Sequence, residues 1–266
     1  MTTPILVTGG TGTLGRLVVA RLRDAGHPVR VTSRSPHEDT DGVEFVTADL
    51  NTGDGVDAAV AGVRTIVHCA GSAKGDADKA RHLVRAAVPA GATHLVYISV
   101  VGADRIPVDS RIDRAMYGYF EAKLAGERIV AESGIPFTTL RTTQFHDLIL
   151  TMATQLAKLP VIPALRGARC QPIDAEDVAD RLTELALGEP AGLVAEMGGP
   201  TTYSMTGMIR DYLTAAHRYR RPVVSFRPPG KAAGAFLAGA NLAPDQAVGR
   251  RTWEDFLARR VASKVA

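Results

Sequence analysis

The segment Thr8-Gly9-Gly10-Thr11-Gly12-Thr13-Leu14-Gly15 decides the fold, because it joins a short apolar strand to a helical pattern. Its glycines fit two spacings at once, G-x-x-G-x-x-G from Gly9 and G-x-G-x-x-G from Gly10. Glycine is required here for three reasons: the turn is tight, the backbone must approach a pyrophosphate, and the helix must pack closely on the strand. The N-terminus of the next helix also offers free N–H groups to an anion. We therefore expect the segment to bind a dinucleotide through Gly9, Thr11, Gly12, Thr13, Leu14 and Gly15.

The residues after this segment and after the second strand select the type of nucleotide. A phosphate-binding P-loop needs Lys and then Ser or Thr after the last glycine, whereas Arg16 and Leu17 stand here. An NAD-binding chain carries an acid about twenty residues past the fingerprint. This chain has Ser33 and Arg34 at that point, and a guanidinium can hold a 2′-phosphate by forked hydrogen bonds. The prediction is NADP(H); the alternative is that Arg34 is only a solvated loop residue.

The first half of the chain alternates strand and helix patterns, as βαβ units do. We expect an α/β fold of the Rossmann type, with a doubly wound parallel sheet. The predicted strands are 4–8, 28–32, 43–46, 65–69, 94–101 and 136–141, and the predicted helices are 14–24, 77–90 and 117–132.

Beyond about residue 144 the pattern loosens into helical stretches between Pro/Gly-rich turns, with helices expected at 174–187, 205–218 and 251–262. We interpret residues 1–266 as a single NAD(P)-binding Rossmann domain. A small, mainly helical substrate-binding lobe is expected to be built mainly from about 145–170 and 200–266.

The composition is that of a soluble globular protein, with 45% hydrophobic and 22% charged residues among 266. It excludes a disordered chain, a collagen-like repeat and a disulfide scaffold. The apolar stretch 232–240 falls short of the roughly 18 residues of a membrane span. No signal peptide is recognised, and two cysteines suit a reducing compartment. We expect a cytoplasmic protein without a membrane partner.

The charge is only mildly basic, with a net charge of +3 and a pI near 9.0. The basic run 217–221 is interpreted as a solvated helix end, because nucleic-acid binding usually needs a denser stripe. A small-molecule substrate is the expected partner, with no nucleic acid, and the oligomeric state stays open.

Further motifs resemble one known family. They are Ala48-Asp49-Leu50, His68-Cys69-Ala70-Gly71, the stretches 97–102 and 119–127, and 136–145. Over residues 4 to about 200 the chain resembles an atypical short-chain dehydrogenase/reductase of the NmrA-like branch. The resemblance implies that Asp49 and Leu50 lie by the adenine, that Cys69, Ala70 and Gly71 line the cofactor, and that Thr142, Gln144 and Phe145 approach the nicotinamide.

Tyr119 and Lys123 are four residues apart in a strong helical pattern, so their side chains share one face. At about 4 Å and an effective dielectric near 20, an ammonium attracts a phenolate by about 4 kcal/mol. That corresponds to about three pKa units. We therefore expect the pKa of Tyr119 to fall toward neutrality, where the phenol acts as a general acid. The resemblance implies that Lys123 also holds the nicotinamide ribose.

The third catalytic candidate is Ser99, the hydroxyl nearest to the position that the resemblance implies just past the fifth long strand. Val100 and Val101 follow it, so a working hydroxyl one or two places later would be missing. Ser99 would then be an ordinary strand residue bonded to the backbone. His146 either contacts substrate or has a structural role at a helix start. No metal site is expected, because His68 and Cys69 are adjacent on a strand and face opposite ways.

From these residues together we interpret the protein as an NADPH-dependent oxidoreductase that transfers hydride to a small carbonyl or quinone. Two alternatives stay open at this point. One is a non-catalytic redox sensor that binds NADP(H). The other is a nucleotide-sugar epimerase or dehydratase.

Overall fold

The computed structural model describes residues 3–71, 75–216 and 221–265. The chain divides into two compact units. Unit 1 comprises Met1–Ser99, Gly118–Arg141 and Val178–Ala195, and unit 2 comprises Val100–Tyr117, Thr142–Asp177 and Glu196–Ala266.

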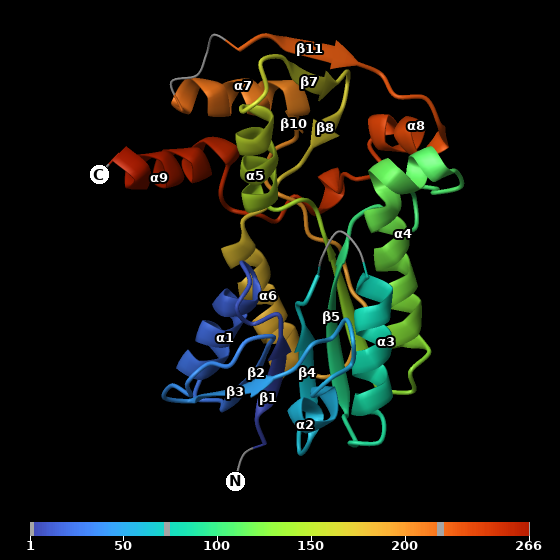
Figure 1. The fold of residues 1–266 in the computed structure, drawn as a ribbon, viewed down its shortest axis with the longest axis vertical. Coiled ribbons are helices and arrows are strands. Elements are labelled where there is room, and N and C mark those ends of the chain that lie inside the picture. Colours follow the sequence, from blue (N-terminus) through green and yellow to red (C-terminus); the bar gives the residue numbers. More distant parts are fainter. Residues whose placement is uncertain (1–2, 72–74, 217–220, 266) are drawn as a thin grey trace. The chain divides into compact units, whose positions relative to one another are not determined.

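Unit 1 is built on a seven-stranded sheet with the order β3-β2-β1-β4-β5-β6-β9 (Figure 1). The strands are β1 Ile5–Thr8, β2 Val29–Ser33, β3 Val43–Thr47, β4 Thr65–His68, β5 His94–Val100, β6 Phe137–Thr142 and β9 Gly192–Leu193. The first six follow the order of a doubly wound dinucleotide-binding sheet, in which ligands bind at the carboxyl ends of the strands. The parallel α/β fold that the sequence predicts is confirmed.

Helices cover both faces of this sheet (Figure 1). They are α1 Gly15–Asp24, α2 Val56–Val60, α3 Asp76–Ala87, α4 Arg111–Ala131 and α6 Ala175–Leu187. On one face α2, α3 and α4 bury apolar side chains such as Val60, Leu83 and Val130 against Leu6 and Leu95 of the sheet. On the other face an ion pair between Arg21 and Asp180 joins α1 to α6. Helices on both faces explain why every residue of β5 is buried.

Unit 2 contains four α-helices and four short strands among its described residues. The helices are α5 His146–Leu156, α7 Met205–Ala215, α8 Lys231–Ala238 and α9 Trp253–Val265. Strands β8 (Arg169–Cys170) and β10 (Tyr203–Ser204) pair antiparallel, and β7 (Ile162–Leu165) and β11 (Val223–Phe226) pair in parallel. The two small sheets do not appear in the sequence prediction, because strands of two to four residues carry little periodicity.

Helix α4 begins at Arg111, six residues before the predicted start at residue 117. The reason is a reciprocal cap that the sequence analysis missed. The Asp113 amide donates to Ser110 Oγ at 3.0 Å, and the Ser110 amide donates to Asp113 Oδ2 at 3.2 Å. The basic run 217–221 and the end of the helix predicted to reach residue 218 fall largely on residues 217–220, outside the described residues. Every helix within the described ranges is too short or too polar to cross a bilayer.

Candidate cofactor and active site

The glycine loop lies between β1 and α1, at the carboxyl end of the central strand. Gly9 has a φ of +68°, and a Cβ there would stand 2.7 Å from the Ala70 Cα. A Cβ on Gly15 would collide with the Gly9 carbonyl oxygen, and one on Gly10 would stand 2.7 Å from Val31 Cγ1. All three neighbours are packed parts of the fold. The glycines are therefore required by the close contact of the loop with β2, β4 and α1.

The start of α1 leaves backbone N–H groups available to a ligand. The Arg16 amide donates to the Gly12 carbonyl at 3.1 Å, so the helix ladder begins there. Among the described residues, no side chain caps α1 and no carbonyl accepts from the amides of Thr13 or Leu14. Free amides at a helix N-terminus attract anions. The residues present thus fit a dinucleotide pyrophosphate.

The ends of β2 and β3 carry the residues assigned to the adenosine half of the cofactor. Ser33 is buried at the end of β2, and Arg34 follows it as an exposed side chain. The Asn51 amide donates to Asp49 Oδ1 at 2.8 Å, and this bond leads the causes that lower the pKa of Asp49; Arg34 contributes by its charge. Leu50 is buried, and its carbonyl oxygen shares a hydrogen bond of 2.8 Å with His82 Nδ1.

Residues 69–71 follow β4 and continue beside the glycine loop. The Cys69 amide donates to the Thr8 carbonyl at 3.1 Å, and burial raises the pKa of the Cys69 thiol to about 12. A Cβ on Gly71 would stand 3.3 Å from Lys123 Nζ. Lys123 Nζ therefore lies beside residues 69–71, which are next to the glycine loop. The predicted roles of Lys123 and of residues 69–71 in cofactor binding require this proximity.

Lys123 is 3% exposed and is held from several sides. Its Nζ donates to the Ile98 carbonyl at 3.1 Å and pairs with Asp76 Oδ2 at 3.0 Å. It lies 5.8 Å from the centre of the Tyr119 ring. Burial opposes the ammonium charge, but the surrounding tyrosines and Asp76 outweigh it and raise the pKa of Lys123.

The predicted net shift in the pKa of Tyr119 is wrong in direction, although Lys123 lowers this pKa as expected. Burial raises the pKa of Tyr119, the Lys123 charge lowers it only in part, and Asp76 raises it further. The expectation considered the ammonium alone, whereas burial of the phenol is the largest influence on its pKa and the Asp76 carboxylate acts in the same direction as burial. The Tyr119 phenol is thus held more firmly in its protonated form.

Ser99 lies on β5 and is 3% exposed. Its Oγ has no hydrogen-bond partner among the described residues, so the alternative of a strand serine bonded to the backbone does not hold. A buried hydroxyl without a partner is uncommon and calls for a ligand or water. This geometry leaves Ser99 available for a bound molecule.

The segment assigned to the nicotinamide belongs to unit 2. Thr143 Oγ1 accepts from the Gly199 amide at 3.3 Å, and the Gln144 carbonyl accepts from the Ile173 amide at 2.9 Å. The side-chain amide atoms of Gln144 are buried and have no partner among the described residues. The contacts of Thr142, Gln144 and Phe145 with a nicotinamide stay a prediction.

His146 begins α5 and is fully buried. Its ring centre lies 5.0 Å from that of Phe256 and 6.0 Å from that of Trp253, and burial lowers its pKa. This packing favours the structural role for His146.

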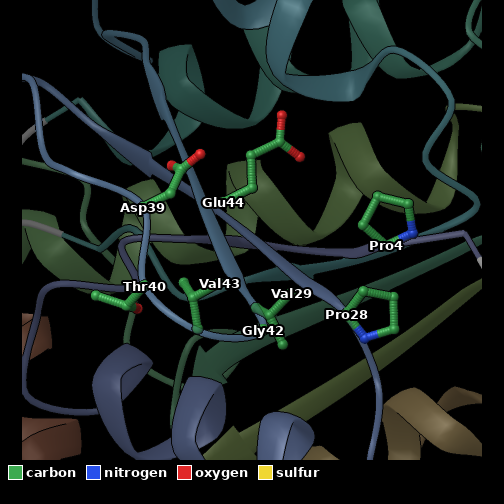
Figure 2. A pocket seen from close by; sticks show the side chains of 8 residues that line it. All are labelled: Pro4, Pro28, Val29, Asp39, Thr40, Gly42, Val43 and Glu44. Atoms are coloured by element: carbon green, nitrogen blue, oxygen red, sulfur yellow. The ribbon is translucent and has the colours of Figure 1, made fainter.

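A hollow among the described residues lies elsewhere in unit 1 (Figure 2). It has a volume of about 250 Å³ and is lined by residues that precede or begin strands, including Pro4, Pro28 and Val43. It lies at the amino ends of β1, β2 and β3, whereas doubly wound sheets bind ligands at the carboxyl ends. We do not assign the cofactor to it.

His68 carries no sign of a metal ligand. Its Nδ1 shares a hydrogen bond of 2.6 Å with Thr8 Oγ1, and its ring stacks on Tyr97 at 5.4 Å. Within the described part of the chain, His, Cys, Asp and Glu side chains form no group of three that could hold a metal. Burial, assisted by the Lys123 charge, lowers the pKa of His68 to about 3.

This pKa predicts a loss of stability in acid. In the unfolded chain His68 binds a proton below its ordinary pKa of 6.5, whereas folded His68 stays neutral because its pKa is lower. The free energy of unfolding therefore falls as the pH falls. Between pH 7 and pH 5 the expected loss of unfolding free energy from this group is about 2 kcal/mol. Urea unfolding at both pH values measures it. The variant His68→Gln should lose about 2 kcal/mol less over the same interval; an equal loss would refute the assignment.

A cofactor loop on a sheet of this order defines a dinucleotide-binding protein of the Rossmann class. Residues 9–188 match the NAD(P)H-binding family, and the chain belongs to that family. The predicted cofactor class and the resemblance to atypical short-chain dehydrogenase/reductases are confirmed.

Relatives and solved structures agree with this class. A (4-alkanoyl-5-oxo-2,5-dihydrofuran-3-yl)methyl phosphate reductase of Streptomyces griseus is 33% identical over 179 residues, 66% of this chain and 60% of that protein. Quinone oxidoreductase 2 of Escherichia coli is 25% identical over 218 residues, 78% of this chain and 72% of the relative. The NADPH complex of the quinone oxidoreductase QOR2 from Escherichia coli has a TM-score of 0.76 at 19% identity, over 96% of this chain and 99% of that one. The chain spans 60% of the length of the Streptomyces reductase, and 54% and 63% of two further relatives.

Proposed function

We propose that the chain is an NADPH-dependent oxidoreductase that acts on a small carbonyl or quinone. The observation that carries the proposal is the position of Lys123, whose Nζ lies against Gly71 beside the glycine loop and 5.8 Å from the Tyr119 ring. The reductase and quinone oxidoreductase among the relatives support this reaction class. Acceptor-dependent loss of NADPH, measured against a blank without acceptor, tests it.

Each residue of the site has a definite role in this proposal. Bound NADPH supplies the hydride. Tyr119 donates a proton to the substrate oxygen, since its phenol is in the protonated form at neutral pH. Ser99 Oγ donates a hydrogen bond to the same oxygen, and the Lys123 ammonium binds the nicotinamide ribose. Thr142, Gln144 and Phe145 contact the nicotinamide, and the lobe at about 145–170 and 200–266 binds the substrate.

Arg34 is proposed to select NADPH over NADH. It is exposed directly after β2, where an NAD-binding chain would carry an acid. Replacing it by alanine removes a charge-assisted contact with the 2′-phosphate, so NADPH affinity should fall about tenfold or more while NADH affinity stays the same. Titration of both nucleotides measures the ratio, with Arg16→Ala as the matched exposed control. An unchanged ratio in Arg34→Ala would refute the role.

A redox sensor of NADP(H) is the second candidate. The observation in its favour is that burial, with a further contribution from Asp76, raises the pKa of Tyr119, so the phenol is not activated by a lowered pKa. A sensor predicts no acceptor-dependent turnover together with a marked difference in affinity between NADP⁺ and NADPH. Equal affinities combined with turnover would exclude it.

A further inference from the structure

A buried carboxylate that the sequence analysis did not single out faces the active-site lysine. Asp76 is the first residue of α3 and is 1% exposed. Its Oδ2 lies 3.0 Å from Lys123 Nζ, although the two residues are far apart in the chain. Both charges are removed from water, which is costly unless the partners satisfy one another. Such a pair needs an explanation beyond ordinary stability.

Asp76 is the carboxylate that pairs with Lys123 among the groups that surround the ammonium. The Ile98 carbonyl accepts from Nζ at 3.1 Å, and the Tyr97 ring lies 5.1 Å from it. The other titratable groups that act on Lys123 or Asp76, or stand next to them, are His68, Cys69, Lys79, Tyr119 and Glu127. Glu127 is bound on both oxygens by Arg141, at 2.9 and 2.7 Å. Asp76 is therefore the group that compensates the ammonium.

We propose that Asp76 is a positioning residue, which holds the Lys123 ammonium charged and against Gly71, where the nicotinamide ribose binds. The inference rests on the proposed function for the role of Lys123. Asp76 and the Ile98 carbonyl restrain the ammonium from two sides. This restraint leaves remaining N–H capacity for the cofactor.

Removal of the carboxylate should change the charge state of the lysine. Burial is the largest influence on the pKa of Lys123 and it acts to lower it. Without Asp76 the ammonium loses its carboxylate partner while burial still disfavours the charge, so the pKa of Lys123 should fall and the lysine should lose its proton at a lower pH than in the wild type. The wild-type lysine stays charged at neutral pH, because its pKa is raised.

The test is the NADPH dissociation constant between about pH 6 and pH 9, measured by nucleotide fluorescence. The variants are Asp76→Asn, Asp76→Glu as the conservative rescue, and Asp78→Asn as the exposed control on the same helix turn. The ratio of the Asp76→Asn constant to the wild-type constant should rise with pH, toward tenfold per pH unit. The ratios for Asp76→Glu and Asp78→Asn should stay constant. A constant ratio for Asp76→Asn would overturn the proposal.

A second measurement, of the melting temperature, tests the proposal when Asp76→Asn does not fold stably. The double variant Asp76→Asn/Lys123→Met removes the Lys123 charge together with its partner, so it should regain most of the melting temperature that Asp76→Asn loses. Lys79, which pairs with Asp76 Oδ1 at 3.4 Å, loses that partner in both variants and does not affect the comparison. A double variant as unstable as Asp76→Asn would also overturn the proposal. Because the readouts are binding and melting, they stand even when no acceptor supports turnover. Absence of turnover would refute the oxidoreductase and leave the Asp76 result separate.

Discussion

Replacing Tyr119 by phenylalanine is expected to lower acceptor-dependent NADPH oxidation by about 100-fold or more, because the reaction loses its general acid. The loss should fall on kcat, with the NADPH dissociation constant unchanged. Tyr119 is half-buried on α4, and Phe keeps its ring in contact with Phe120 at 6.0 Å. The melting temperature should therefore stay near that of the wild type. Steady-state rates with the best acceptor, together with thermal unfolding, measure both.

Tyr117→Phe is the matched control for this prediction. Tyr117 lies two residues earlier on the same helix, and its hydroxyl is buried without a partner among the described residues. Removal of an unsatisfied hydroxyl should leave stability and activity nearly unchanged. Full activity in Tyr119→Phe, or an equal loss in Tyr117→Phe, would contradict the assignment of the acid.

Gly15→Ala is expected to reduce NADPH affinity by about 100-fold or more and to lower the melting temperature. The added Cβ would collide with the Gly9 carbonyl oxygen and stand 2.7 Å from Gly10 Cα, and neither backbone atom can move without opening the loop. The amides at the start of α1 would then no longer converge on the pyrophosphate. Titration with NADPH and thermal unfolding are the measurements.

Gly234→Ala provides the control for a glycine substitution in a helix. Apart from the backbone of α8 itself, none of the atoms in the described part of the chain lies within 4 Å of a Cβ at Gly234. Because alanine favours helix over glycine by up to about 1 kcal/mol, this variant should be as stable as the wild type or slightly more stable. NADPH binding by Gly15→Ala at wild-type affinity would show that the loop does not hold the cofactor.

The sheet of unit 1 could be predicted from the sequence because its signals are local. The glycine loop fixes a strand before it and a helix after it, and the strand patterns recur at βαβ spacing. The start of α4 was missed because its signal is the Ser110–Asp113 cap rather than an apolar period. The small sheets of unit 2 were missed because their order depends on pairing between distant segments, such as Ile162 with Val223.

The candidate site could be predicted only in part. Spacing places Tyr119 and Lys123 on one helix face, and the glycine loop predicts where the cofactor pyrophosphate binds. No local signal marks Asp76, because an acid in the first turn of a helix is ordinary. Its role follows only from burial and from the long-range contact with Lys123. The expected pKa of Tyr119 was wrong chiefly because burial of the phenol raises it, and Asp76 adds to that effect.

NADPH consumption by the purified protein decides whether the chain is an oxidoreductase. A panel of quinones, aldehydes and ketones is supplied beside a blank without acceptor, and NADPH binding is titrated in the same sample. We expect consumption that depends on an acceptor and is faster with NADPH than with NADH. Tight NADPH binding without consumption by any member of the panel would contradict it and favour the redox sensor.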